Sequence, residues 1–146
     1  MSESNRPKSI RSFNRLNLAA TLVGIFNILI HYGVLRALAI SKGASPAGPF
    51  LGILLLVLSY LIFWFFIYRR GSGIAKWVFV VVTAVSVAMI PLRLGEVIAV
   101  GKIYAVIDGI AFALQLAAMA MLFRIDAKVW LDRKGRSTAS EAKLPG

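Results

Sequence analysis

The chain has 146 residues, of which 59% are hydrophobic and only 16% are charged. Soluble globular proteins carry ~25% charged residues, and disordered chains are poor in apolar ones, so this composition disfavours both classes. There is no Cys and a single His, which excludes a disulfide framework, a thiolate metal site and a His-rich catalytic zinc site. We therefore expect a small membrane protein without a metal or a cofactor.

Four stretches of the sequence are apolar enough to cross a bilayer, which takes about 20 residues for ~30 Å of hydrocarbon. They cover residues 16–40, 50–68, 77–94 and 103–123. These stretches are continuously apolar rather than alternating, and lipid cannot hydrogen-bond a backbone, so each is expected to be a helix. The sequence predicts an all-α membrane protein with four transmembrane helices in an up-down bundle, spanning residues 16–123.

The connection between the third and fourth stretches is ambiguous. Pro91 is expected to kink or end the third helix, because proline lacks a backbone N–H and clashes with the preceding turn. The following residues, 94–102, contain an apolar run at Val97–Val100. They fit a loop, a short interfacial helix or an extension of the third helix beyond the kink.

The basic residues predict the orientation. Thirteen of the 17 Lys and Arg residues would lie on one side of the membrane, in the segment 1–15, at the turn 69–76 and in the tail 124–146. Because basic flanks stay in the cytoplasm, both termini are expected there, with the tail starting as a helix end in the headgroup zone. The side chains expected to contact anionic lipid headgroups are Arg69, Arg70, Lys76, Trp77, Lys128 and Trp130.

The net charge of +11 could also suggest nucleic acid, but no nucleic-acid-binding motif is present. Topology and anionic headgroups account for the positive residues, so no nucleic-acid partner is expected.

Several polar residues fall inside the apolar stretches, where an ionisable group is costly and is a functional candidate. In an up-down order His31 and Arg93 lie toward the outer side, together with Tyr104 and Asp108. Helical spacing places Asn27 with His31, and Tyr104 with Asp108 and Gln115, on shared faces. The sequence predicts an outward-facing polar pocket for a ligand or a proton, with these candidates: His31, Asp108, Arg93, Asn27, Gln115 and Tyr104.

An alternative role for these residues is to join helices, because polar side chains often hydrogen-bond between membrane helices. Asp108 is expected to pair with Arg93, and such a pair could serve only to fix the register of two helices. Arg36 and Glu96 are expected at the interface with water, and Lys42 is expected to be a surface residue without a role.

Two segments carry a resemblance to known proteins. One is the basic turn followed by a tryptophan-led helix, residues 69–77, and the other is Met121-Leu122-Phe123 followed by Ala127 and Trp130. The chain is similar in these features to the small four-helix inner-membrane proteins of bacteria whose function is unknown. The resemblance implies this architecture and a bacterial inner-membrane location, and it implies no activity.

Three functions stay open. The first is a non-enzymatic helper or subunit that acts through helix contacts with a membrane protein partner or a second copy, and the chain is expected not to be an enzyme. The second is a small oligomeric transporter or channel that uses the outward-facing pocket. The third is a lipid-modifying enzyme with His31 and Asp108 as base and orienting group.

Overall fold

The computed structural model describes the backbone of residues 6–141 and the side chains of residues 6–133. Over these residues the chain is helical and contains no strand. The helices in chain order are α1 (Lys8–Ile30), α2 (Tyr32–Ser41), α3 (Gly48–Phe63), the π-helix η2 (Trp64–Arg69), α4 (Gly73–Ala88), α5 (Ile90–Val100), α6 (Lys102–Met121) and α7 (Ile125–Glu141).

Three apolar segments are long enough to cross a membrane: α1, α3 together with η2, and α6. The pair α4 and α5 makes a fourth if the two helices count as one bent span. The all-helical prediction is thus confirmed for the described part of the chain, and three to four of its helices are compatible with membrane spans.

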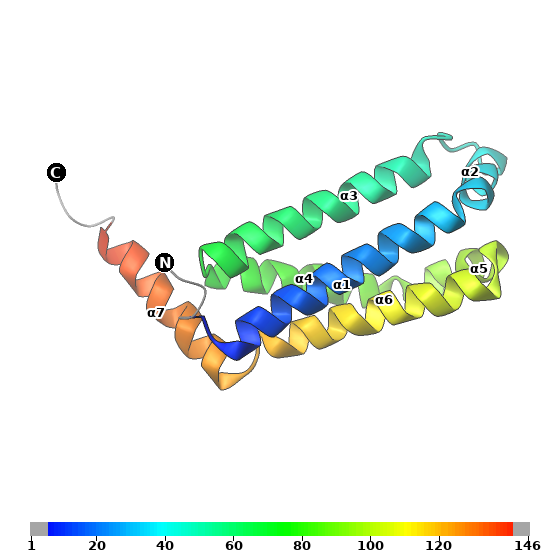
Figure 1. The fold of residues 1–146 in the computed structure, drawn as a ribbon. Coiled ribbons are helices and arrows are strands. Elements are labelled where there is room, and N and C mark those ends of the chain that lie inside the picture. The colour runs from blue at the N-terminus through cyan, green and yellow to red at the C-terminus, as the bar shows by residue number, and fades with distance from the viewer. Residues whose placement is uncertain (1–5, 142–146) are drawn as a thin grey trace.

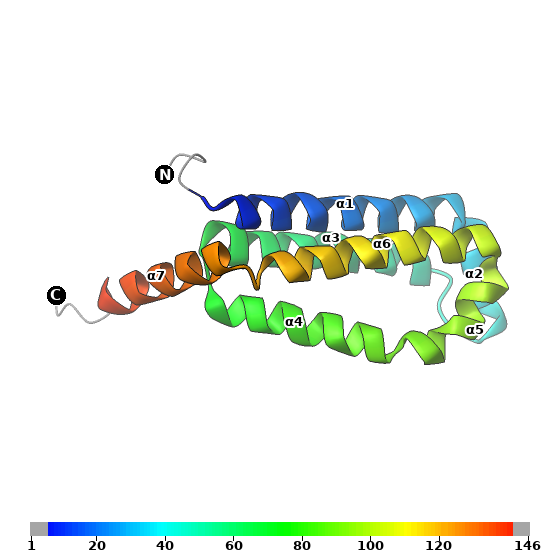
Figure 2. The same ribbon diagram turned by 90° about the horizontal axis from the view of Figure 1, so that it is seen from below.

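The long helices lie roughly along one axis. The beginning of α1 and the helix α7 lie at one end, which we call the terminal end, whereas α2 and α5 lie at the opposite, distal end (Figure 1). α1 packs along α6 and, on its other side, against α3. Gly24 brings α3 close, because a Cβ at this position would lie 3.3 Å from Leu56 Cδ1. Figure 2 shows α4 set apart from the layer that α1, α3 and α6 form.

The first helix differs from the expected range 16–40 at both ends. α1 begins at Lys8, since a backbone helix can continue through a basic segment that hydropathy excludes. It ends at Ile30, and His31 has φ −106° and ψ 13°, outside the helical range. The His31 Nδ1 atom lies 3.0 Å from the carbonyl oxygen of Asn27 and competes for the acceptor that the helix itself uses. α2 then starts in a new direction.

The kink expected at Pro91 is present. α4 and α5 meet at an angle of 64° around Met89, and Pro91 lies in the first turn of α5, where a missing N–H is tolerated. Residues 90–100 are helical, which excludes a loop over 94–100 and agrees both with a short interfacial helix and with an extension beyond the kink. Gly101, with φ 143°, separates α5 from α6 in a conformation that only glycine adopts readily.

The tail forms a separate helix. α6 ends at Met121, and a turn over residues 122–124 leads into α7. The Asp126 carboxylate of α7 accepts a hydrogen bond of 3.2 Å from the backbone N–H of Ser9, in the first turn of α1. This contact satisfies one of the N–H groups that the start of a helix leaves free, and it ties α7 to α1. Residues 1–5 of the expected N-terminal segment and 142–146 of the tail lie outside the described residues.

The buried core is concentrated at the terminal end. Its members come from α1, the end of α3, η2, α4, α6, the turn after α6, and α7, and they are Ile10, Phe13, Phe63, Ile67, Tyr68, Phe79, Ala118, Leu122 and Ala127. Elsewhere large apolar side chains face outward, for example Leu22, Phe26, Leu58 and Val81. An exposed apolar surface of this extent is compatible with a lipid environment.

Candidate ligand-binding cavity

A cavity of about 410 Å³ lies among α1, α3, α4, α5 and α6. We call it the main cavity. Its volume falls in the ~300–1,000 Å³ range of small-molecule sites. It extends along α1 from Asn17 to Asn27, which corresponds to about 15 Å at 1.5 Å per residue. The polar side chains in its wall are Asn17, Thr21, Asn27, Ser59, Tyr60, Ser86, Arg93, Tyr104, Asp108 and Gln115.

Helical spacing explains how the polar side chains reach one cavity. On α1, Asn17, Thr21 and Asn27 follow at i, i+4 and i+10, which is one face of a helix. On α6, Tyr104, Asp108 and Gln115 repeat this pattern at i, i+4 and i+11. Because α1 packs along α6, the two polar faces turn to the same space.

The closest link between the two faces is a buried hydrogen bond. The side-chain Nδ2 of Asn27 donates to the main-chain carbonyl oxygen of Tyr104 at 3.1 Å. Asn27 is 1% exposed, and its other polar atom, Oδ1, has no hydrogen-bond partner within the described part of the chain. A buried acceptor without a partner is costly, so Asn27 offers an unused acceptor at the wall of the main cavity.

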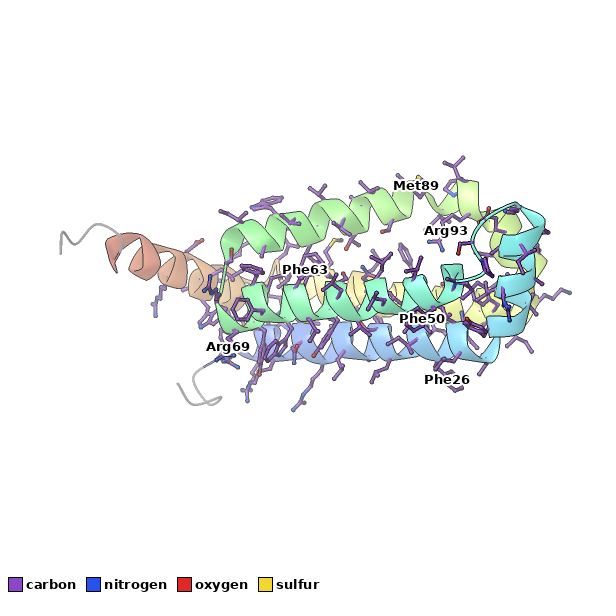
Figure 3. All side chains as sticks on the ribbon, turned by 90° about the horizontal axis from the view of Figure 1, so that it is seen from above. Phe26, Phe50, Phe63, Arg69, Met89 and Arg93 are labelled. Carbon is purple, nitrogen blue, oxygen red and sulfur yellow. The ribbon has the colours of Figure 1, made fainter. Side chains whose placement is uncertain are left out.

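Arg93 and Asp108 both line the main cavity but do not form the expected ion pair. The salt bridge found among the described residues is that of Lys42 with Glu96, and it involves neither Arg93 nor Asp108. Arg93 and Asp108 also line a second cavity of about 270 Å³ between α4, α5 and α6. Figure 3 shows Arg93 between the start of α5 and α3. The two side chains therefore present a cation and an anion to a common space instead of neutralising each other.

His31 is the one of the six pocket candidates that does not line the main cavity. Its ring packs edge-to-face on that of Tyr104, with 5.3 Å between the centroids. Its Nδ1 atom donates to the Asn27 carbonyl in the tautomer that fits this contact. Five of the six candidates thus line one cavity: Asn27, Arg93, Tyr104, Asp108 and Gln115. His31 lies outside this cavity, at the break between α1 and α2.

The main cavity is closed toward the terminal end. Phe79 lines it there and is 1% exposed. The Phe79 ring packs edge-to-face against Phe63, at 4.8 Å between centroids, and against Phe13 at 5.3 Å. These three rings, which we call the aromatic floor, separate the cavity from the terminal end.

The cavity is open at its side, between α3 and α4. Leu55 of α3 and Val82 of α4 line it and are 64% and 43% exposed. The two helices do not pack closely against each other, and Figure 2 shows α4 turned away from the α3 side of the molecule. The open flank therefore has apolar edges.

The distal end is covered by α2 and α5. Lys42 at the end of α2 forms an ion pair with Glu96 of α5, which bridges the two short helices. Both residues line a third cavity of about 260 Å³ that shares Ile28 and Tyr104 with the main cavity. Lys42 is exposed, as expected of a surface residue, and its partner Glu96 was not expected, because a sequence does not show that α5 folds back toward α2.

The residues expected to contact lipid headgroups lie at the terminal end. Arg69, Arg70 and Lys128 are exposed, and the guanidinium of Arg70 lies 5.0 Å from the centroid of the Phe65 ring. Trp77 is exposed and Trp130 is half-buried. Lys76 is only 7% exposed and lies beneath aromatic rings, with its ammonium 4.6 Å from the Phe123 ring centroid.

Ser59 and Tyr60 were missed as members of the site. The stretch 50–68 carries no charge, and its Leu-rich sequence favours lipid contact along all faces. Thr21, one turn after Asn17, could have been found from its i, i+4 spacing. The described residues contain no group of His, Cys, Asp and Glu that could hold a metal ion. Comparison of the chain with protein-family models, curated proteins and solved structures finds no match.

Proposed function

We propose that the chain is a small integral membrane protein that binds a ligand in the main cavity. The membrane spans would be α1, α3 with η2, the bent pair α4–α5, and α6, in an up-down order in a bacterial inner membrane. The basic flanks gathered at the terminal end support a cytoplasmic location for both termini. The distal end, with α2 and α5, would then face the opposite side.

The observation that carries the proposal is a polar cavity in which the Oδ1 atom of Asn27 has no hydrogen-bond partner and Arg93 and Asp108 form no ion pair, among the residues that the structure describes. If Asn27, Arg93 and Asp108 served only to join helices, they would pair with one another across the helix interfaces. Instead Asn27 leaves its Oδ1 unpaired, and Arg93 and Asp108 form no ion pair in the described part of the chain. Groups of this kind in a cavity of ligand size favour a binding site.

The same geometry separates binding from the two other roles of the pocket. A channel through one copy of the chain would need an open floor, and the aromatic floor closes the cavity toward the terminal end. A His31–Asp108 enzyme would need both side chains at the ligand, and His31 lies outside the main cavity. A binding protein or a carrier therefore fits the cavity best.

The test is to fill the cavity. Ala111 lines the main cavity, whereas Ala113 of the same helix is exposed and does not line it. The wild-type protein, extracted in a mild detergent, is expected to retain a small molecule or lipid in native mass spectrometry. Ala111→Trp should lose it and Ala113→Trp should keep it. A wild-type protein without a retained molecule, or equal retention by the two variants, would contradict ligand binding and favour a helper that acts through helix contacts.

A further inference from the structure

We infer that the ligand of the main cavity is a zwitterionic lipid headgroup with a primary ammonium group, as in phosphatidylethanolamine. This inference rests on the proposed function and names the chemistry of the ligand. It starts from two separate sets of unpaired groups in the cavity wall, one that accepts hydrogen bonds and one that is cationic.

The accepting set is formed by Asn27 and Asp108. Asn27 is buried and its Nδ2 is committed to the carbonyl of Tyr104, so the amide orientation is fixed and Oδ1 is the atom left free. Asp108 lies four residues after Tyr104 on α6, about 6 Å along the axis. The amide oxygen and the carboxylate therefore lie within about one helical turn of each other along the wall of the main cavity. A primary ammonium group can donate three hydrogen bonds. It also carries the positive charge that would pair with the Asp108 carboxylate.

The cationic group is Arg93, which lies across the cavity on α5. Its guanidinium has no carboxylate within salt-bridge distance among the described residues. A planar guanidinium binds a phosphate oxygen pair in bidentate geometry. A ligand with an ammonium and a phosphate a few bonds apart would satisfy both sets together, which neither a simple anion nor a simple cation would do.

The shape of the cavity indicates a lipid rather than a dissolved zwitterion. The aromatic floor closes one end, and α2 and α5, joined by Lys42 and Glu96, cover the other. The open flank runs between Leu55 and Val82, both of them exposed apolar side chains. A headgroup can enter there from the bilayer while its acyl chains stay between α3 and α4.

The experiment compares three phospholipids that differ in the headgroup. The protein in detergent is titrated with phosphatidylethanolamine, phosphatidylcholine or phosphatidylglycerol, and the 1:1 complexes are quantified by native mass spectrometry. Phosphatidylcholine has a positive charge but no N–H donor, and phosphatidylglycerol has no ammonium. We expect phosphatidylethanolamine to bind about tenfold more tightly than either, because phosphatidylcholine leaves the buried acceptor of Asn27 unpaired and phosphatidylglycerol leaves the Asp108 carboxylate without a positive charge. Equal affinities for the three lipids would overturn the inference.

Two variants assign the preference to its residues. Asp108→Asn keeps the shape of the side chain but removes its charge. It should reduce the affinity for phosphatidylethanolamine to the affinity for phosphatidylcholine. Arg93→Gln should lower the affinity for all three lipids, because all three carry the phosphate group. Arg36→Gln, an exposed arginine at the same end that lines none of the three cavities, is the control and should bind as the wild type does. A full preference in Asp108→Asn would contradict the inference.

The source of the headgroup is tested by competition. Free phosphoethanolamine at the same concentration as the lipid should not displace it, and displacement would show that a dissolved zwitterion is the ligand. A failure of the headgroup inference can be told apart from a failure of the proposed function. If another lipid is held and Ala111→Trp releases it, ligand binding stands and only the zwitterion is excluded, whereas the absence of any ligand that Ala111→Trp releases excludes both.

Discussion

Asn27 of α1 and Tyr104 of α6 are 77 residues apart and are joined by a buried hydrogen bond, from the Asn27 side-chain Nδ2 to the Tyr104 carbonyl oxygen. The bond fixes the register of the two helices that carry most of the polar wall. It also determines which atom of Asn27 stays free. The helix contact and the candidate binding site are thus made by the same residue.

Substitution at Asn27 and Asn17 should have different effects on stability. Asn27→Leu removes an interhelical hydrogen bond, and polar contacts between membrane helices contribute about 0.6 kcal/mol on average. Asn17 is 6% exposed and its Nδ2 has no partner among the described residues, so Asn17→Leu removes a buried group that is not satisfied. We expect a small loss for Asn27→Leu and no loss, or a gain, for Asn17→Leu in thermal unfolding of the protein in detergent. The reverse order would contradict the hydrogen bonding described above.

The bend between α4 and α5 should depend on Pro91. Pro91→Ala restores an N–H that can bond to the carbonyl of Val87 and continue the α4 helix. The angle of 64° should then decrease, and α5 should move away from α2. The chain has no Cys, so spin labels at Val78→Cys and Ile98→Cys, both exposed positions, report on one pair of sites. Their separation should increase in the Pro91→Ala background, and an unchanged distance would assign the bend to packing and not to the proline.

The Lys42–Glu96 pair should hold the distal end closed without adding much stability. Both side chains are about half exposed, at 48% and 54%, and exposed ion pairs contribute little to stability because solvent screens the two charges. Glu96→Gln is expected to leave the unfolding temperature nearly unchanged but to speed amide hydrogen exchange in α2. The double variant Lys42→Glu with Glu96→Lys should restore the slow exchange. If the reversed pair exchanges as fast as Glu96→Gln, attraction between the two charges does not hold the helices together.

The contact of α7 with α1 should weaken at acid pH. Hydrogen bonding from Ser9 lowers the pKa of Asp126 from its ordinary value of 3.8. A lowered pKa in the folded state gives a stabilisation that is present above the unfolded pKa and is lost as the pH falls through the folded pKa. Asp126→Asn should therefore be less stable than the wild type at pH 7, and the difference should shrink below about pH 4. Thermal unfolding of the two proteins from pH 3 to 7 measures this, and a difference independent of pH would contradict the role of the carboxylate.

Features that depend on the residues of a single helix could be predicted from the sequence. The apolar stretches gave the long helices, Pro91 gave the kink, and the spacing of Tyr104, Asp108 and Gln115 gave one polar face of the cavity. Hydropathy does not indicate that α1 begins at Lys8, because backbone hydrogen bonds extend the helix into a basic segment that is not apolar. The break at His31 coincides with a contact of its ring nitrogen with the Asn27 carbonyl, and hydropathy registers neither.

Relations between distant segments could not be predicted. The pairing of Arg93 with Asp108 was expected from charge alone, but the direction of α5 after the bend leaves the two side chains on a shared cavity. The same bend brings Glu96 to Lys42. Ser59 and Tyr60 become part of the site only because α3 lies across the cavity from α6, and their own sequence gives no indication of it.

The most direct test of ligand binding in the main cavity is a crystal structure of the wild-type protein grown from a lipid phase that contains phosphatidylethanolamine. The account predicts headgroup density between Arg93 and Asp108, an N–H donor on Asn27 Oδ1, and acyl chains that leave between Leu55 and Val82. A collapsed cavity, with α4 packed on α3 and Arg93 in an ion pair with Asp108, would contradict it.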